Sequence, residues 1–201
     1  MKNLFIAVLV FVVLAIATTG SFAQPGKISF GIGADAALPM DSFFKDAWSF
    51  GFGGTARGYY MFNDMVSFTA TAGYMTFPGK DVTVSAGGAA AKFTQGNLSM
   101  IPVLVGARYY FSPAESKFRP YGAFEFGMVF SSYSQPSQQV NVVVGGVVVG
   151  TTGTPAVSAS GSDFSYQPQI GFEASKFDVG VRYLGISNFS AVAFRVGYIF
   201  N

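Results

Sequence analysis

The stretch from Phe189 to Asn201 reads FSAVAFRVGYIFN, and its side chains alternate between two kinds. Large apolar side chains occupy every second position: Val192, Phe194, Val196, Tyr198 and Phe200. The positions between them carry Ala193, Arg195 and Gly197. Because successive side chains of a β-strand point to opposite faces, this pattern predicts a strand with one apolar and one polar face. Such a strand is typical of a barrel that meets lipid outside and encloses a polar interior.

Similar alternation recurs along the chain. It predicts eight strands, at about 27–38, 47–62, 65–76, 94–111, 119–133, 162–173, 177–186 and 191–201. Each is as long as the roughly 9 to 11 residues that a tilted membrane strand needs, whereas globular strands average about 5 to 6. The sequence therefore predicts an all-β fold, an eight-stranded antiparallel up-and-down transmembrane barrel.

Composition separates this barrel from water-soluble ones such as lipocalins. Charged residues make up 11% of the chain, against about 25% in a soluble domain. The face opposite the aromatic side chains is rich in Gly, Ser, Ala, Thr and Gln rather than Lys and Glu, so the aromatic face is the one that meets lipid. With 12 basic and 10 acidic residues, the chain also lacks the excess positive charge of a nucleic-acid-binding protein.

The N-terminus has the layout of a cleavable signal peptide over residues 1–23. Lys2 precedes an apolar run from Leu4 to Ala17, and the small-residue ending Ser21-Phe22-Ala23 predicts cleavage after Ala23. An anchoring helix is the alternative, but the run is shorter than the roughly 20 residues that cross a bilayer. The barrel domain is then 24–201, exported to the outer membrane of a Gram-negative bacterium. The chain contains no Cys, which excludes a lipoprotein anchor and disulfides.

Short and long connections alternate between the predicted strands, which places both termini of the mature chain in the periplasm and the long loops outside. The long loop 134–161 contains VNVVVGGVVVGTTGT, which predicts a β-hairpin around Gly145-Gly146. Three interpretations of this hairpin are open. It extends the fifth and sixth strands beyond the membrane, it offers an extracellular edge to a partner, or it adds two membrane strands to make ten.

The predicted inward faces carry ionisable side chains of both signs. We expect a lumen charge cluster of Arg57, Arg108, Glu125, Glu173, Asp178, Arg182 and Arg195, with Asp35 on the same face of the first strand. Eight strands leave an interior that side chains just fill, so ion pairs are expected to plug the lumen. A charge-lined ion path is the alternative interpretation.

Aromatic residues gather near the predicted strand ends. They are expected to form the girdles that membrane barrels place at both interfaces: Trp48, Tyr60, Phe62, Tyr74, Tyr109, Phe111, Tyr198 and Phe200.

The mature chain resembles the small outer-membrane β-barrel domain of the OmpA/OmpX type over its whole length. The closing strand FRVGYIFN is similar to the C-terminal signal that the barrel-insertion machinery reads. That family commonly ends in Phe, whereas here Phe200 is followed by Asn201. The resemblance implies an integral barrel in contact with outer-membrane lipids, and we expect a monomer.

The sequence argues against catalysis. It contains no His, the usual base of a serine hydrolase, so we expect no catalytic site, no metal site and no cofactor. The favoured hypothesis is a structural or surface-interaction protein whose loops contact an extracellular protein or matrix ligand. The alternative is a narrow channel for small or hydrophobic solutes, suggested by the inward positions of Met100, Pro102 and Leu104.

Overall fold

The computed structural model describes residues 26–86, 89–144, 146–187 and 189–200. The signal peptide predicted over 1–23 and Asn201 lie outside these residues. The described elements, in chain order, are β1 (Ile28–Pro39), α2 (Ser42–Ala47), β2 (Gly51–Met61), β3 (Val66–Phe77), β4 (Asp81–Ala86), β5 (Ala89–Thr94), β6 (Asn97–Tyr110), β7 (Phe118–Gln135), β8 (Gln138–Val144), β9 (Val147–Thr154), β10 (Val157–Ala174), β11 (Phe177–Ile186) and β12 (Phe189–Phe200).

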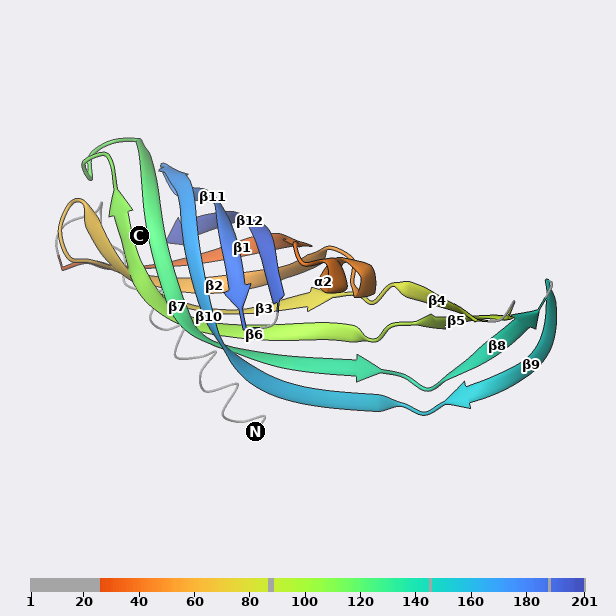
Figure 1. The fold of residues 1–201 in the computed structure, drawn as a ribbon. Helices are drawn as coiled ribbons and strands as arrows, with labels where there is room; N and C mark the ends of the chain where they lie inside the picture. The colour runs from red at the N-terminus through yellow and green to blue at the C-terminus, as the bar shows by residue number, and fades with distance from the viewer. Residues whose placement is uncertain (1–25, 87–88, 145, 188, 201) are drawn as a thin grey trace.

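Eight of these strands close into a barrel in the order β1-β12-β11-β10-β7-β6-β3-β2 (Figure 1). The first and last strands pair antiparallel from Phe30 opposite Phe200 to Pro39 opposite Ala191, which seals the sheet. Closure leaves no free edge around the barrel, the condition for spanning a membrane with strands. The prediction of an eight-stranded antiparallel barrel is confirmed.

The barrel is apolar outside and polar inside. Phe52, Phe126 and Val105 on the outer surface are 50, 45 and 52% exposed. The charged side chains of Arg57, Arg108 and Glu125 are buried in the interior instead. This distribution reverses that of a soluble protein, as expected where lipid surrounds the sheet. No helix among the described residues is long and apolar enough to cross a membrane.

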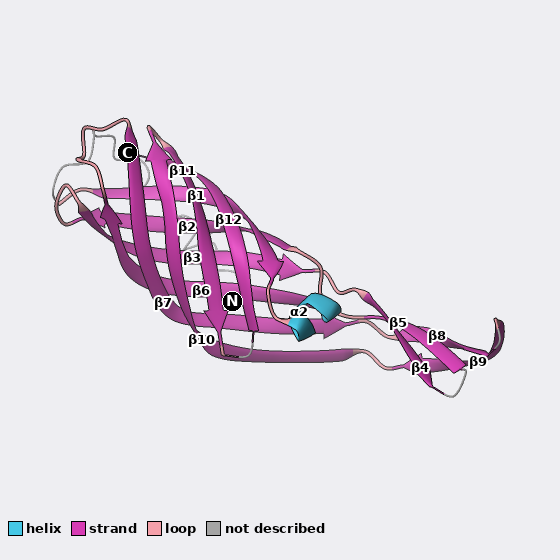
Figure 2. Cartoon of the chain, turned by 45° about the horizontal axis from the view of Figure 1, so that its top comes forward, coloured by secondary structure: helices cyan, strands magenta, loops and turns pink. Residues whose placement is uncertain are grey.

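A second sheet, with the order β4-β5-β8-β9, projects from the end of the barrel opposite the C-terminus (Figure 2). Strands β7 and β10 stay in register from Phe118 opposite Ala174 to Gln135 opposite Val157, so they carry the barrel wall toward this sheet. The hairpin β8–β9 follows and pairs with β5 through Ala89 opposite Val144. We call these four strands the extracellular sheet, after the side of the membrane on which the sequence predicts the long loops.

The ten-strand interpretation is wrong, because β8 and β9 lie in the extracellular sheet and β7 pairs directly with β10. The hairpin instead extends the structure beyond the membrane. Two further details differ from the sequence prediction. Residues 77–93, between two predicted strands, contain β4 and all but the last residue of β5, and the strand expected from residue 47 begins at Gly51. Residues 42–47 form α2, and the amide of Trp48 ends its hydrogen-bonding pattern by donating to Phe44 O at 3.0 Å.

Candidate functional site

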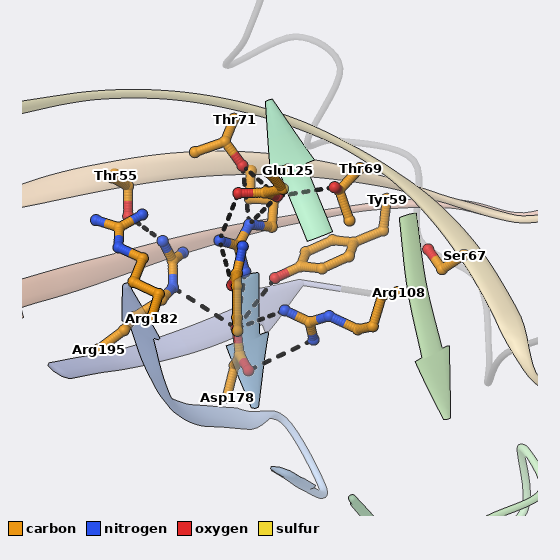
Figure 3. Close-up of polar contacts among 12 residues, drawn as sticks. Thr55, Tyr59, Ser67, Thr69, Thr71, Arg108, Glu125, Asp178, Arg182 and Arg195 are labelled. Carbon is orange, nitrogen blue, oxygen red and sulfur yellow. Dashed lines mark hydrogen bonds and ion pairs between the residues drawn. The ribbon is translucent and has the colours of Figure 1, made fainter. Parts of the chain in front are cut away.

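Side chains fill the described lumen in two layers, a polar layer toward the periplasmic end and an apolar layer toward the outer end. Strands β2, β3, β6, β7, β11 and β12 all contribute to the polar layer (Figure 3). Its charged side chains occupy the alternate strand positions that point into the lumen. The predicted charge cluster lies in this layer, and its members divide into three groups, each around one or two carboxylates.

Glu125 is the centre of the first group and is fully buried. Its Oε1 accepts hydrogen bonds from Thr69 Oγ1 at 2.8 Å and Thr71 Oγ1 at 2.9 Å. Arg57 of β2 approaches it, with Nε 3.2 Å from Oε1 and Nη2 3.2 Å from Oε2. Paired and hydrogen-bonded on both oxygens, the carboxylate meets the condition under which a buried charge is tolerated.

Asp178 and Glu173 form the second group around Arg108. The Arg108 guanidinium lies 2.6 Å from Glu173 Oε1 and 3.2 Å from Asp178 Oδ2. Tyr110 donates to Glu173 at 2.6 Å and Tyr121 to Asp178 at 2.7 Å. The ring of Tyr121 lies 3.6 Å below the Arg108 guanidinium carbon, a cation–π contact. Arg195 reaches the same aspartate, with Nε 3.6 Å from Oδ2.

Two glycines make room for the hydroxyl of Tyr121. Gly171 and Gly180 face each other across β10 and β11. A Cβ atom at either position would lie 2.6 or 2.7 Å from Tyr121 Oη. The absence of side chains at these two positions therefore lets Tyr121 reach Asp178.

Asp35 is the centre of the third group. Arg182 Nη2 lies 2.8 Å from Asp35 Oδ1, and Thr55 Oγ1 donates to Asp35 Oδ2 at 2.7 Å. Arg195 in turn donates to Thr55. Arg182 and Asp35, both expected on the inward face, thus form an ion pair.

The apolar layer lies at the outer end of the lumen. Helix α2 places Phe44 inside the barrel mouth with 1% of its surface exposed. Its ring centroid is 5.0 Å from that of Phe77 and 4.8 Å from that of Phe189. Met75, Met100, Leu98 and Val129 pack below it in the same cluster. The three residues expected to line a channel are also buried: Pro102, and Met100 and Leu104 with 2% and 1% exposed.

Trp48 belongs to this layer, so its expected position in the aromatic girdle is wrong. It is 9% exposed, and its indole Nε1 donates to Gly96 O at 2.9 Å. The cause is α2, which turns the chain before β2 and directs Trp48 across the mouth. The other girdle residues lie on the outer surface. Their exposed fractions include 45% for Tyr60, 59% for Phe62, 51% for Tyr74, 49% for Tyr109 and 63% for Phe111. The rings of Tyr198 and Phe200 meet edge to face there, with centroids 5.0 Å apart.

A carboxylate outside the membrane ties the start of α2 to the adjacent strand β12. Asp41, just before the helix, accepts hydrogen bonds from the amide of Ser190 and, at 2.8 Å, from its hydroxyl. These hydrogen bonds lower the pKa of Asp41. In the extracellular sheet, the pKa of Asp81 is lowered in the same way by Lys92 and Thr94, both 2.7 Å away. Both residues are therefore anionic at neutral pH.

Sequence reasoning missed several members of the polar layer. Arg119 is buried against Tyr110, with its guanidinium carbon 3.7 Å from the ring centroid. The sequence could have placed it there, because Arg119, Tyr121 and Glu125 are separated by even numbers of residues along one strand and therefore share a face. Thr69 and Thr71 could be placed inward in the same way, but their pairing with Glu125 depends on the barrel's register. Among the described residues, no group of three acidic side chains is arranged to hold a metal ion.

A profile of the outer membrane protein beta-barrel domain matches residues 7–200. The chain belongs to the outer membrane protein beta-barrel domain family. It is thus a small, non-catalytic β-barrel of the bacterial outer membrane, of the OmpA/OmpX-like type.

Solved structures of other barrels are similar to this family member. One is the attachment invasion locus protein Ail of Yersinia pestis in complex with the heparin analogue sucrose octasulfate. It is 15% identical with a TM-score of 0.51, over 88% of this chain and 100% of that one. Another is the N-terminal β-barrel domain of Pseudomonas aeruginosa OprF, 13% identical with a TM-score of 0.46, over 89% of this chain and 100% of that one. At such identity, the likeness to Ail concerns the fold alone. A comparison with curated protein sequences found no match.

Proposed function

We propose that this barrel is a closed anchor whose function lies in the extracellular sheet, which binds an extended segment of a partner protein. The observation that carries the proposal is the free edge of β9. Among the described residues, β9 pairs with β8 alone, so the backbone groups on its other side have no partner strand. Proteins recruit extended segments to such edges by main-chain hydrogen bonding.

The lumen supports the first half of this proposal. The ion pairs of the polar layer and the rings around Phe44 lie one behind the other along the barrel axis. An interior of eight strands has little space beyond what side chains occupy. The alternative function, a narrow channel for small or hydrophobic solutes, has less support, because both layers would have to move.

The side chains of β9 support the second part of the proposal, the binding of an extended partner segment. Val147, Val148 and Val149 are 65, 55 and 60% exposed, an unusual density of apolar side chains for a surface strand. The ladder shifts register between Val142 and Val143, and beyond this bulge Thr151 and Thr154 continue the edge opposite Asn141 and Gln138. A partner strand would therefore align beside the threonines and bury the valines.

The same region indicates that the partner segment is uncharged. No Asp, Glu, Lys or Arg occurs between Glu125 and Asp163. Ail is described in complex with a sulfated heparin analogue. In this chain the outer segments carry Lys45, Lys80 and Lys92 beside Asp41, Asp46 and Asp81, and Lys92 is paired with Asp81 at 2.7 Å. This balance favours an uncharged polypeptide over a polyanion.

The test uses the refolded full-length protein in nonionic detergent and two fluorescent probes. One is a labelled peptide with the sequence of β8, QQVNVVV, the strand that β9 already accepts on its other side, and the second is labelled heparin. We expect the peptide to bind in fluorescence anisotropy and heparin not to bind. The variant Val148→Lys with Thr151→Lys should weaken peptide binding at least tenfold, because lysine on an edge opposes pairing. The control Ser158→Lys, on β10, should bind as the parent does. Heparin binding without peptide binding would overturn the proposal.

A further inference from the structure

A cavity of about 350 Å³ opens at the periplasmic end of the barrel, opposite the extracellular sheet. Its walls include the apolar side chains of Met61, Tyr110 and Ile199. Its cationic lining includes Lys117, Lys176 and Arg119. The volume lies at the lower end of the range of small-molecule sites, about 300–1,000 Å³.

The local fold brings the two rim lysines together. The amide of Ser175 donates to Lys117 O at 2.9 Å, which ties the loop between β6 and β7 to the turn between β10 and β11. Ser175 has a φ of 56°, in the left-handed region that allows this tight turn. Lys176 follows directly, so both lysines line one opening and their side chains are exposed there.

Arg119 gives the cavity a buried cation. Its side chain is 7% exposed, and its Nη2 donates to Asp64 O at 2.8 Å. Its Nη1 lies 3.8 Å from Glu173 Oε2, outside hydrogen-bond distance, and its buried Nε makes no hydrogen bond to any described residue. A guanidinium with a buried, unsatisfied N–H can donate it to an anion.

The cavity lining carries more cationic than anionic side chains. Glu173 is held by Arg108 and by the hydroxyl of Tyr110, each at 2.6 Å. Glu115 lies exposed at the rim. Against these two carboxylates the lining carries Arg119, Lys117, Lys176 and also Lys27. An anion entering the cavity would therefore meet more positive than negative charge, next to an apolar wall.

We propose that this cavity binds a phosphate or carboxylate group attached to a small apolar body, with the anion toward Arg119 and the rim lysines and the apolar part against Met61, Tyr110 and Ile199. Such a group could come from a soluble periplasmic molecule or from a phospholipid of the inner leaflet. The chemistry of recognition is the same for both sources. The site is separate from the extracellular sheet, so this proposal stands independently of the proposed function.

The test is isothermal titration of the refolded full-length protein in nonionic detergent with phenyl phosphate, and with benzyl alcohol as the uncharged probe. We expect saturable binding of phenyl phosphate and at least tenfold weaker binding of benzyl alcohol. Lys117→Glu with Lys176→Glu should weaken phenyl phosphate binding at least tenfold, and these exposed positions leave the fold intact. The matched control is Lys45→Glu with Lys80→Glu at the outer end, which should bind as the parent does.

Two outcomes would overturn the site: absence of saturable binding by the parent at millimolar phenyl phosphate, or an equal loss in both double variants, which would indicate a bulk charge effect. Competition with the short-chain lipid dihexanoyl phosphatidylglycerol distinguishes a phospholipid ligand from a soluble one. Competition supports the site with a lipid headgroup as its ligand, and phenyl phosphate binding without competition supports the site with a soluble ligand.

Discussion

Glu125 has its negative charge fully enclosed by the barrel, and its stability there depends on Arg57, Thr69 and Thr71. Each of these residues comes from a strand other than that of Glu125. The burial of a carboxylate is unfavourable unless such partners are already in place. The polar layer is therefore a set of mutually dependent residues rather than a collection of independent ion pairs.

Replacing Glu125 by Gln is expected to lower the free energy of unfolding by about 3 to 5 kcal/mol, because Arg57 loses its nearest carboxylate. The remaining anionic partner of Arg57 is Asp178 at 3.6 Å, which is already shared with Arg108 and Arg195. The double variant Glu125→Gln with Arg57→Met should cost less than the single variant, since it removes both charges. The measurement is denaturant unfolding from lipid vesicles. Glu115→Gln, the same change at an exposed carboxylate, is the control and should stay within about 0.5 kcal/mol of the parent. A double variant less stable than Glu125→Gln would contradict the pairing.

At the residue level, the sequence predicted which face of a strand a side chain occupies more reliably than which residues it contacts. Parity along a strand correctly placed Arg57, Arg108 and Asp178 in the lumen, because alternation is a local property. The contacts of an inward side chain depend on which other strands bring their side chains to the same place in the lumen. Arg182 pairs with Asp35 at 2.8 Å, and the alternation along the strands alone does not predict this pairing.

Strand β7 shows how one element passes from lipid to water along a single face. Phe124, Phe126, Met128 and Phe130 lie on its outer face and are followed on the same face by Ser132 and Ser134. The change from aromatic to serine side chains marks the height at which the strand leaves the apolar zone. Its partner β10 carries Ser158 opposite Ser134 and Ser160 opposite Ser132.

This arrangement predicts that the cost of an outward charge depends on height along β7. Phe126→Arg should destabilise the barrel by about 2 to 4 kcal/mol, because it places a cation at lipid depth. Ser132→Arg, on the same face of the same strand, should cost about 0 to 1 kcal/mol. Unfolding titrations of both variants from vesicles provide the comparison. Equal costs at the two positions would show that the apolar zone is assigned incorrectly.

The elements that sequence analysis missed are the short ones. Helix α2 and strands β4 and β5 are each 6 residues long, too short for a clear period in the sequence. Strand β4 pairs with β5, and β5 and α2 are stabilised by partners that are distant in the sequence. Phe44 of α2 packs against Phe77 and Phe189, and β5 pairs with β8. The membrane strands were predictable because their length and alternation are imposed by the bilayer along the whole segment.

The whole molecule combines a barrel with two layers of inward side chains, the extracellular sheet at one end and a cationic cavity at the other. The outer apolar layer adds to the ion-pair plug expected from the sequence. Two chemically different layers in series mean that loss of one leaves the other across the lumen. Function is then expected at the two ends of the barrel rather than along its axis.

Single-channel conductance of the refolded full-length protein in a planar bilayer tests this closed architecture most directly. The two layers predict that insertion leaves the conductance near the background of the bare bilayer across the applied voltage range. A large, steady conductance from the unmodified protein would contradict the closed lumen and favour the channel function instead.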